Sequence, residues 1–317
     1  MIATAHTNNI LKLWQPDGTL IGTLQGHAER VNAVAWRPQS QAIASASQDK
    51  TVKLWQRDGQ ILQTLAGHED SVLGVSFSPD GQTIASASRD KTVKIWQEYG
   101  TLLRTLEGHD GPVNWVSFSP DGQTIASGSE DNTVKLWTID GELLDTLQGH
   151  TDGVWEVTFS PDGQLMVTAS ADRTIIIWSR EGRPLSTLQG HTNLVSGVSF
   201  SPDSQAIATS SNDKTVRIWS IDGQLLYTLK GHNKGVTSVS FGPKGRVASA
   251  SADGTVILWD LADVTLENLL MHGCYWLSDY LQHNPYVSRG DRTLCEATTP
   301  SPVPRRSPGN EGAGYPN

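Results

Sequence analysis

Residues 67–96 read GHEDSVLGVSFSPDGQTIASASRDKTVKIW, and this stretch decides the fold because three strand patterns follow one another within it. The runs 72–77, 83–88 and 92–96 are short, rich in strand-forming residues and bounded by turn signals. Between the first two, Pro79 presets φ and Gly81 accepts a positive φ, which predicts a turn. A fourth run follows at 101–106. We therefore expect one four-stranded antiparallel sheet.

The same pattern returns along the chain. Gly-His occurs at 26–27, 67–68, 108–109, 149–150, 190–191 and 231–232, always 41 residues apart. Tryptophan keeps nearly the same phase at Trp14, Trp55, Trp96, Trp137, Trp178, Trp219 and Trp259. A period of about 40–45 residues with an early Gly-His and a late Trp is the signature of the WD40 repeat. Residues 1–260 thus resemble the WD40 repeat family, and the resemblance implies an all-β propeller, a closed ring of small radial sheets.

The number of blades is the ambiguous point. Six segments carry an inner strand, whereas seven carry the second and third strands that end at the tryptophans. We favour seven blades, the first without its inner strand, because Thr4, Asn8 and Trp14 are in phase with the other copies. The alternative is six blades, with residues 19–24 completing the last one. The start inside a blade also suggests a fragment of a longer repeat array.

Composition limits the partners. The 317 residues carry a net charge of −9, which argues against a nucleic-acid surface. No apolar run is long enough to cross a membrane, and no secretory signal is visible at the N-terminus. The two cysteines, Cys274 and Cys295, lie outside the repeats. We expect a cytoplasmic monomer without a disulfide framework.

Each of six copies carries a His, a Ser or Thr, an Asp and a Trp at fixed offsets. The sets are His27, Ser45, Asp49, Trp55; His68, Ser86, Asp90, Trp96; His109, Ser127, Asp131, Trp137; His150, Thr168, Asp172, Trp178; His191, Thr209, Asp213, Trp219; and His232, Ser249, Asp253, Trp259. The resemblance implies a chain of hydrogen bonds from indole to hydroxyl, imidazole and carboxylate. The first copy departs from the pattern, because Asn8 replaces the Asp and no Gly-His precedes it.

Ser, His and Asp together also suggest hydrolysis, but catalysis needs one such site and here there are six. We therefore predict no enzyme activity, no cofactor and no metal. The rival hypothesis is a propeller enzyme of hydrolase or lactonase type with a site in the central channel. Glu156 is the only acid in the six inner strands, so no ligand cluster is expected there. No phosphate loop or kinase motif set is present.

The resemblance places partners on the top face of the ring, at positions three and five after each Gly-His histidine and just before each turn Asp. These positions vary between copies while their flanks barely change. With two extra tryptophans of the inner strands, the predicted surface comprises Arg30, Asn32, Gln48, Ser71, Leu73, Arg89, Asn114, Trp115, Glu130, Trp155, Leu194 and Asn212. The alternative is that these positions are merely solvated.

Trp115 and Trp155 are the sharpest candidates because aromatic side chains are favoured interface anchors. Both stand in inner strands at positions where most other copies have small or polar residues. The alternative for each is a packed or channel-lining tryptophan.

Residues 261–295 are expected to form a helical extension, since Leu266, Leu269, Leu270, Cys274, Leu277 and Leu281 recur at helical spacing. Residues 269–295 resemble the tail that follows the last repeat in bacterial, cyanobacterial-type WD40 proteins. A zinc site of His272, Cys274, His283 and Cys295 is the weaker alternative, because the spacing matches no strong template. Residues 296–317 are rich in proline and glycine and should be disordered.

The leading hypothesis for function is a scaffold or sensor that binds protein or peptide partners, similar to WD40 modules of bacterial signalling proteins. A purely structural repeat array within a larger protein is the third alternative.

Overall fold

The computed structural model describes residues 1–39 and 42–261. This part of the chain is all-β, with one 3-10 turn, η1 (Pro243–Gly245). Its strands are β1 (Ile2–Ala5), β2 (Ile10–Trp14), β3 (Leu20–Gln25), β4 (Val31–Trp36), β5 (Ile43–Ser47), β6 (Thr51–Trp55), β7 (Ile61–Ala66), β8 (Val72–Phe77), β9 (Thr83–Ser88), β10 (Val93–Gln97), β11 (Leu102–Leu106), β12 (Val113–Phe118), β13 (Thr124–Ser129), β14 (Val134–Thr138), β15 (Leu143–Leu147), β16 (Val154–Phe159), β17 (Leu165–Ser170), β18 (Ile175–Ser179), β19 (Pro184–Leu188), β20 (Val195–Phe200), β21 (Ala206–Ser211), β22 (Thr215–Ser220), β23 (Leu225–Lys230), β24 (Val236–Phe241), β25 (Arg246–Ser251) and β26 (Val256–Asp260).

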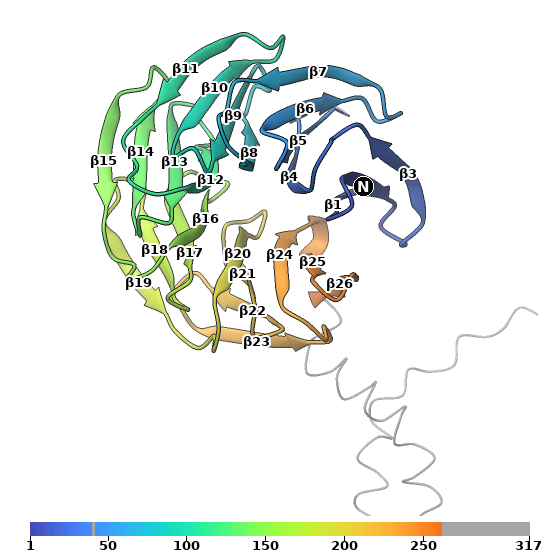
Figure 1. The fold of residues 1–317 in the computed structure, drawn as a ribbon. Coiled ribbons are helices and arrows are strands. Elements are labelled where there is room, and N and C mark those ends of the chain that lie inside the picture. The colour runs from blue at the N-terminus through green and yellow to red at the C-terminus, as the bar shows by residue number, and fades with distance from the viewer. Residues whose placement is uncertain (40–41, 262–317) are drawn as a thin grey trace, which may run out of the picture. The chain divides into compact units, whose positions relative to one another are not determined.

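The strands form seven antiparallel sheets that follow one another around a ring (Figure 1). We call them blades 1 to 7 in chain order. Blades 2 to 6 have four strands each, and each strand pairs with its neighbours in the sequence. Blade 1 contains only β1, β2 and β3, and blade 7 only β24, β25 and β26. The predicted seven-bladed propeller, with a first blade that lacks its inner strand, is confirmed.

The turn between the second and third strands of a blade explains the recurring Asp and the residue after it. Asp90 accepts hydrogen bonds at Oδ1 from the backbone N–H of Thr92 (3.0 Å) and its hydroxyl (2.7 Å). Lys91 between them adopts a φ of 71°. A carboxylate that bonds its own backbone two residues on is a common device for stabilising such a turn. Gly254 takes the same left-handed place in blade 7, with a φ of 86°.

The core lies between blades rather than within them. In each complete junction, the inner strand of one blade covers the second and third strands of the blade before it. Between blades 3 and 4 the buried cluster joins two strands of one blade to the inner strand of the next: Ala85, Ala87, Val93 and Ile95 against Val113, Val116 and Phe118. A sheet that is apolar on both faces is stable only when neighbours cover both, which explains the ring.

Residues Met1–Trp259 form one compact unit. The predicted helical extension, the disordered tail and the four candidate zinc ligands fall almost entirely on residues 262–317, outside the described part of the chain. Among the described residues, no helix is long and apolar enough to pass through a bilayer.

Candidate partner-binding surface

Blade 3 shows how the four recurrent residues are connected. The indole N–H of Trp96 donates to the hydroxyl of Ser86 at 2.8 Å, and the same oxygen lies 2.8 Å from Nε2 of His68. Nδ1 of His68 lies 2.7 Å from Oδ2 of Asp90. The hydroxyl has one proton and already accepts from the indole, so it donates to Nε2. The imidazole then carries its proton on Nδ1 and donates it to the carboxylate.

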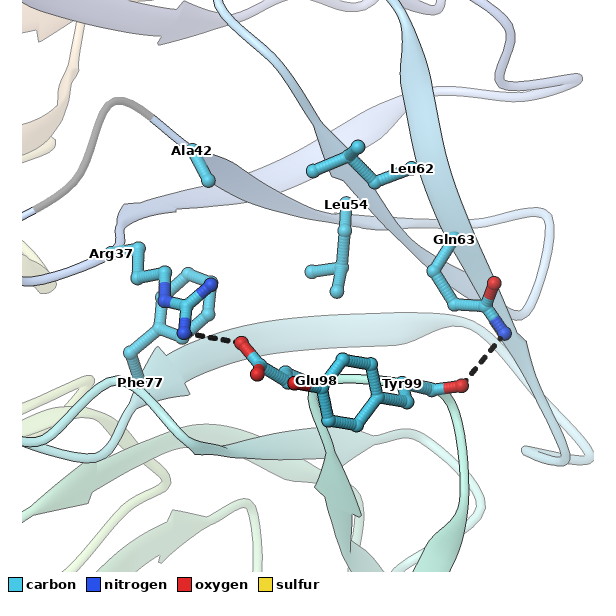
Figure 2. A pocket seen from close by; sticks show the side chains of 8 residues that line it. All are labelled: Arg37, Ala42, Leu54, Leu62, Gln63, Phe77, Glu98 and Tyr99. Carbon is cyan, nitrogen blue, oxygen red and sulfur yellow. Dashed lines mark hydrogen bonds and ion pairs between the residues drawn. The ribbon is translucent and has the colours of Figure 1, made fainter.

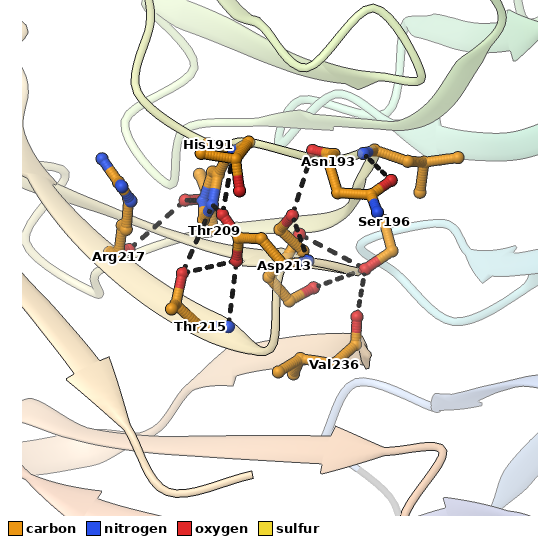
Figure 3. A network of polar contacts seen from close by, with 12 residues as sticks. His191, Asn193, Ser196, Thr209, Asp213, Thr215, Arg217 and Val236 are labelled. Atoms are coloured by element: carbon orange, nitrogen blue, oxygen red, sulfur yellow. Dashed lines mark hydrogen bonds and ion pairs between the residues drawn. The ribbon is translucent and has the colours of Figure 1, made fainter. Parts of the chain in front are cut away.

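The same relay occurs in blades 2 to 7. The distance from indole nitrogen to hydroxyl oxygen is 2.7–3.0 Å in all six. The distance from Nε2 to that oxygen is 2.7–2.8 Å. In blade 6 a threonine supplies the hydroxyl, and Figure 3 shows His191, Thr209 and Asp213 connected with Thr215. The relay therefore connects the strands of each blade through their side chains.

The relay hydroxyls are inaccessible. Ser45, Ser86, Ser127, Thr168 and Thr209 have no exposed surface, and Ser249 has 1%. A nucleophile must reach its substrate, so a hydroxyl enclosed by indole and imidazole cannot attack one. The arrangement stabilises the blades and does not form a hydrolytic site.

Electrostatics at the relays agree with this arrangement. Burial acts to raise the pKa of Asp90, but hydrogen bonds from His68 and Thr92 outweigh it and hold the pKa well below its ordinary value. Burial lowers the pKa of His27, so this ring stays neutral. The carboxylate of Asp90 in blade 3 is therefore charged at pH 7, and the imidazole of His27 in blade 2 is neutral.

Blade 1 uses a different histidine, which the sequence analysis missed. The indole of Trp14 donates to the hydroxyl of Thr4 at 2.9 Å, and that oxygen lies 2.8 Å from Nε2 of His6. The other copies have serine at the position of His6, so comparison of repeats gave no signal. Asn8 is exposed, whereas the neighbouring Asn9 donates to the carbonyl of Ala28 at 2.8 Å.

The predicted top-face residues divide into two groups by exposure. The exposed group consists of Arg30, Gln48, Arg89, Glu130, Trp155 and Asn212. Those half-buried or buried are Asn32, Ser71, Leu73, Asn114, Trp115 and Leu194. Within the exposed group, Arg30 precedes an inner strand and Trp155 is the second residue of one, while the other four residues directly follow a second strand, at the same end of each blade. They therefore lie on one face of the ring.

Two of the predicted asparagines connect neighbouring blades. The amide of Asn32 donates to the carbonyl of Val72 at 2.8 Å, and that of Asn114 to Val154 at 3.0 Å. Ser196 holds the same position in blade 6 and donates to Val236 at 2.6 Å (Figure 3). Asn114 is only 5% exposed. Its assignment as a partner contact is corrected here, because a buried amide committed to the next blade is not available to a ligand.

The two candidate tryptophans differ. Trp115 is half-buried and packs against the core between blades 2 and 3 and against the core between blades 4 and 5. It lies over Gly74, where a Cβ would be 3.0 Å from its Cα and 3.4 Å from its ring. Trp155 is 39% exposed and is the only exposed tryptophan among the residues that the structure describes. Trp115 is thus the packed alternative, and Trp155 is the accessible one.

Comparison with protein families agrees with the geometry. The model of the WD domain, G-beta repeat, matches residues 18–56, 59–97, 100–138, 141–179, 182–220 and 223–260. The chain belongs to the WD40 repeat family. Each matched unit begins near the outer strand of one blade and ends at the tryptophan of the next, so six WD40 units extend over seven sheets. WD40 propellers are typically non-enzymatic scaffolds. No curated protein gives a significant match to this sequence.

The WD40 ring carries one carboxyl on an inner strand. Glu156 follows Trp155 on β16, and its Oε2 accepts a hydrogen bond from the backbone N–H of Val198 at 3.2 Å. Burial raises the pKa of Glu156 to about 8. In residues 1–39 and 42–261, no three His, Cys, Asp or Glu side chains are grouped as metal ligands. Among these residues, Glu156 is therefore not part of a group of potential metal ligands.

A hollow of about 460 Å³ lies between blades 2 and 3 of the WD40 ring, at the opposite end of the strands from the top-face residues (Figure 2). An ion pair joins Arg37 to Glu98 at one side, and Gln63 donates to the carbonyl of Tyr99 at 3.1 Å. Tyr99 is 79% exposed. The signal for it was present in the sequence, because the other copies have Asp or Glu at this turn.

Proposed function

We propose that this WD40 propeller is a non-catalytic scaffold or sensor module that binds protein or peptide partners through its top face. The exposed side chain of Trp155 is the observation that carries the proposal. The exposed residues Arg30, Gln48, Arg89, Glu130, Trp155 and Asn212 make up what we call the top-face surface.

The composition of this surface supports protein recognition. An exposed indole is costly to keep in water, whereas Trp and Arg are the residues that most often contribute large binding energies in interfaces. The surrounding positions carry both signs of charge in Arg30, Arg89 and Glu130. A mixed surface around an aromatic anchor fits a polypeptide better than the uniformly basic surface that nucleic acid requires.

The rigid framework supports the same proposal. Each blade is fixed by its own relay, and the varied residues stand at the ends of these fixed strands. Presenting contact residues on rigid elements lowers the conformational entropy lost on binding. We propose a cytoplasmic monomer that binds partners without a membrane or nucleic-acid contact.

Affinity capture with matched variants tests the proposal. The propeller carrying Trp155→Ala and Arg89→Ala is compared with the wild type, and Tyr99→Ala serves as the control because Tyr99 is exposed on the other face. We expect specific partners to be lost from the double variant and retained by the control. Equal capture by all three proteins, with unchanged circular dichroism, would refute the top-face assignment.

A further inference from the structure

Trp155 occupies an irregular position in β16. Its neighbours Val154 and Glu156 pair with Ser170 and Ala169 of β17, whereas Trp155 has no partner residue on that strand. An extra residue of this kind is a β-bulge, which redirects a side chain from the regular alternation of a strand. The indole is 39% exposed, and its N–H has no hydrogen-bond partner among the described residues. Contacts within the described part of the propeller therefore do not explain why a tryptophan stands here.

Glu130 of blade 4 reaches the segment that leads to Trp155. The inner strands β12 and β16 of the two blades lie side by side in the ring (Figure 1). A Cβ added at Gly153 would lie 3.3 Å from Cα and 3.7 Å from Cγ of Glu130, so the stem of this side chain lies over residue 153. The Glu130 carboxylate has no hydrogen-bond or ion-pair partner in residues 1–39 and 42–261. An unpaired carboxylate and an exposed indole are thus held near each other by the same short segment.

The charge of Glu130 is not offset within its own blade. Blades 2, 3, 5 and 6 have Lys or Arg directly after the turn Asp, whereas blade 4 has Asn132 there. The same end of blade 4 carries two exposed acids, Asp110 and Glu130. In blade 5, by contrast, the acid Asp152 is accompanied by the base Arg173. The blade 4 side of the exposed tryptophan therefore attracts a positively charged group.

The blade that carries Trp155 leaves space beside it. Its residue before the turn Asp is Ala171, whose N–H donates to the carbonyl of Gly153 at 2.9 Å, so this alanine stands beside the start of β16. Blades 2, 3, 4 and 6 have the longer side chains of Gln, Arg, Glu and Asn at this position. A methyl group in their place leaves room for a ligand next to the indole.

Other indoles of the same chain already have a cation over the ring. Nζ of Lys12 lies 5.6 Å from the centre of the Trp14 ring, and Cζ of Arg217 lies 5.9 Å from that of Trp219. Such a cation is attracted by the negative charge on the face of the aromatic ring. Trp155 has no cation of this kind among the described residues.

We propose that the top-face surface recognises an arginine side chain of its polypeptide partner, whose guanidinium lies over the indole of Trp155 and pairs with the carboxylate of Glu130. This contact rests on the proposed function of the surface and specifies its chemistry. A guanidinium suits both groups, because it is planar, stacks on aromatic faces and matches the geometry of a carboxylate. The ammonium of lysine is a compact and strongly hydrated charge, which fits the indole less well.

Glu156 does not take the role of Glu130 at neutral pH. Burial raises the pKa of Glu156 to about 8, so most of its carboxyl groups are uncharged at pH 7. Its Oε2 accepts from the backbone N–H of Val198, which belongs to blade 6 and not to blade 4. Glu130 is therefore the acid that supplies the charge next to the indole.

Titration with single amino-acid derivatives tests the charge requirement. The full chain is prepared with isotope-labelled tryptophan, and the indole signal of Trp155 in nuclear magnetic resonance is assigned by its absence from Trp155→Phe. We expect N-acetyl-arginine amide to shift this signal in a saturable manner. N-acetyl-citrulline amide has nearly the same shape without the charge and should bind at least about threefold more weakly, because it lacks both the cation–indole contact and the ion pair. N-acetyl-lysine amide should also bind more weakly than the arginine derivative.

Two variants that each remove one negative charge locate the carboxylate. Glu130→Gln should weaken binding of the arginine derivative about two- to fivefold. Glu142→Gln removes the same charge from the exposed turn between β14 and β15, at the other end of blade 4, and should leave binding unchanged. Both glutamates are exposed, so neither change should unfold the ring, and circular dichroism checks this.

Partner capture separates this contact from the proposed function. Loss of partners from Trp155→Ala with Arg89→Ala, together with full retention by Glu130→Gln, would leave the top-face surface in place and overturn the role of Glu130. Equal capture by all variants would refute the proposed function, while a Glu130-dependent titration with the arginine derivative would still support the arginine contact.

Three titration results would overturn the arginine contact. The first is binding of the citrulline or the lysine derivative as tightly as the arginine derivative. The second is an equal effect of Glu130→Gln and Glu142→Gln, because the overall charge of the protein would then be the cause. The third is tighter binding of N-acetyl-glutamate amide than of the arginine derivative, because Arg30 and Arg89 would then hold an acidic partner.

Discussion

Replacing Ser86 by alanine is the most direct test of the relay. The change removes one oxygen that accepts from Trp96 at 2.8 Å and contacts His68 at 2.8 Å. Ser86 has no exposed surface, Trp96 has 2% and His68 has 7%, so water cannot replace the lost partner. Each buried polar group left unpaired costs about 1–3 kcal/mol. Two such groups predict a loss of about 2–6 kcal/mol in the free energy of unfolding.

Blade 7 provides the matched control. Ser249 makes the same contacts with Trp259 and His232, but Trp259 is half-buried. Water can reach its indole, so Ser249→Ala should cost only about 1 kcal/mol. Urea unfolding followed by circular dichroism compares the midpoints and slopes of both variants with the wild type. A loss below about 1 kcal/mol for Ser86→Ala, or a larger loss for Ser249→Ala, would refute the reasoning.

Three further predictions concern charge and blade contacts. The pKa of Glu156 is raised from 4.5 to about 8. Its contribution to the stability of the folded state is therefore favourable below pH 4.5 and is lost as the pH rises through 8. The full effect of this shift would be about 5 kcal/mol, and partial access to water reduces it. Glu156→Gln should therefore stabilise the protein by about 1–3 kcal/mol at pH 8 and by little at pH 4, and equal effects in urea titrations at both pH values would contradict this. The pKa of Asp90 is lowered, so its stabilisation is present above about pH 4 and lost as the pH falls below that value; acid titration of Asp90→Asn should show a shallower loss than the wild type, and parallel curves would count against the relay. Asn114→Ala should cost about 1–2 kcal/mol because its amide bonds Val154 in a buried site, whereas the exposed control Gln48→Ala should change the melting temperature little; the prediction fails if the two variants melt alike.

The sequence predicted the ring because its decisive features are local and repeated. Pro79 and Gly81 specify one turn, Asp90 specifies the next, and Trp96 recurs in phase in every copy. Each signal depends on a few neighbouring residues, and its repetition along the chain makes the pattern recognisable. The incomplete first blade followed from the same count.

Features that depend on contacts between blades were less accessible. The exposed positions of Arg89 and Trp155 agreed with the offsets, but nothing local showed that the amide of Asn114 turns toward the next blade. His6 was missed because the other copies have serine at the corresponding position, so the repeat pattern gave no reason to expect a histidine there. Contacts made by residues 40 positions apart have no signature within a single repeat.

The bonds from Asn32, Asn114 and Ser196 recur at every second blade, 82 residues apart. They join blades 2 with 3, 4 with 5, and 6 with 7, while Leu73 and Trp155 stand at the intervening positions without an equivalent donor. The inner strands are therefore joined by this kind of donor at one junction and by other contacts at the next, such as the hydrogen bond from the Val198 N–H to Glu156 between blades 5 and 6. Replacing Asn32 or Asn114 should consequently weaken one junction of the ring and leave its neighbours intact.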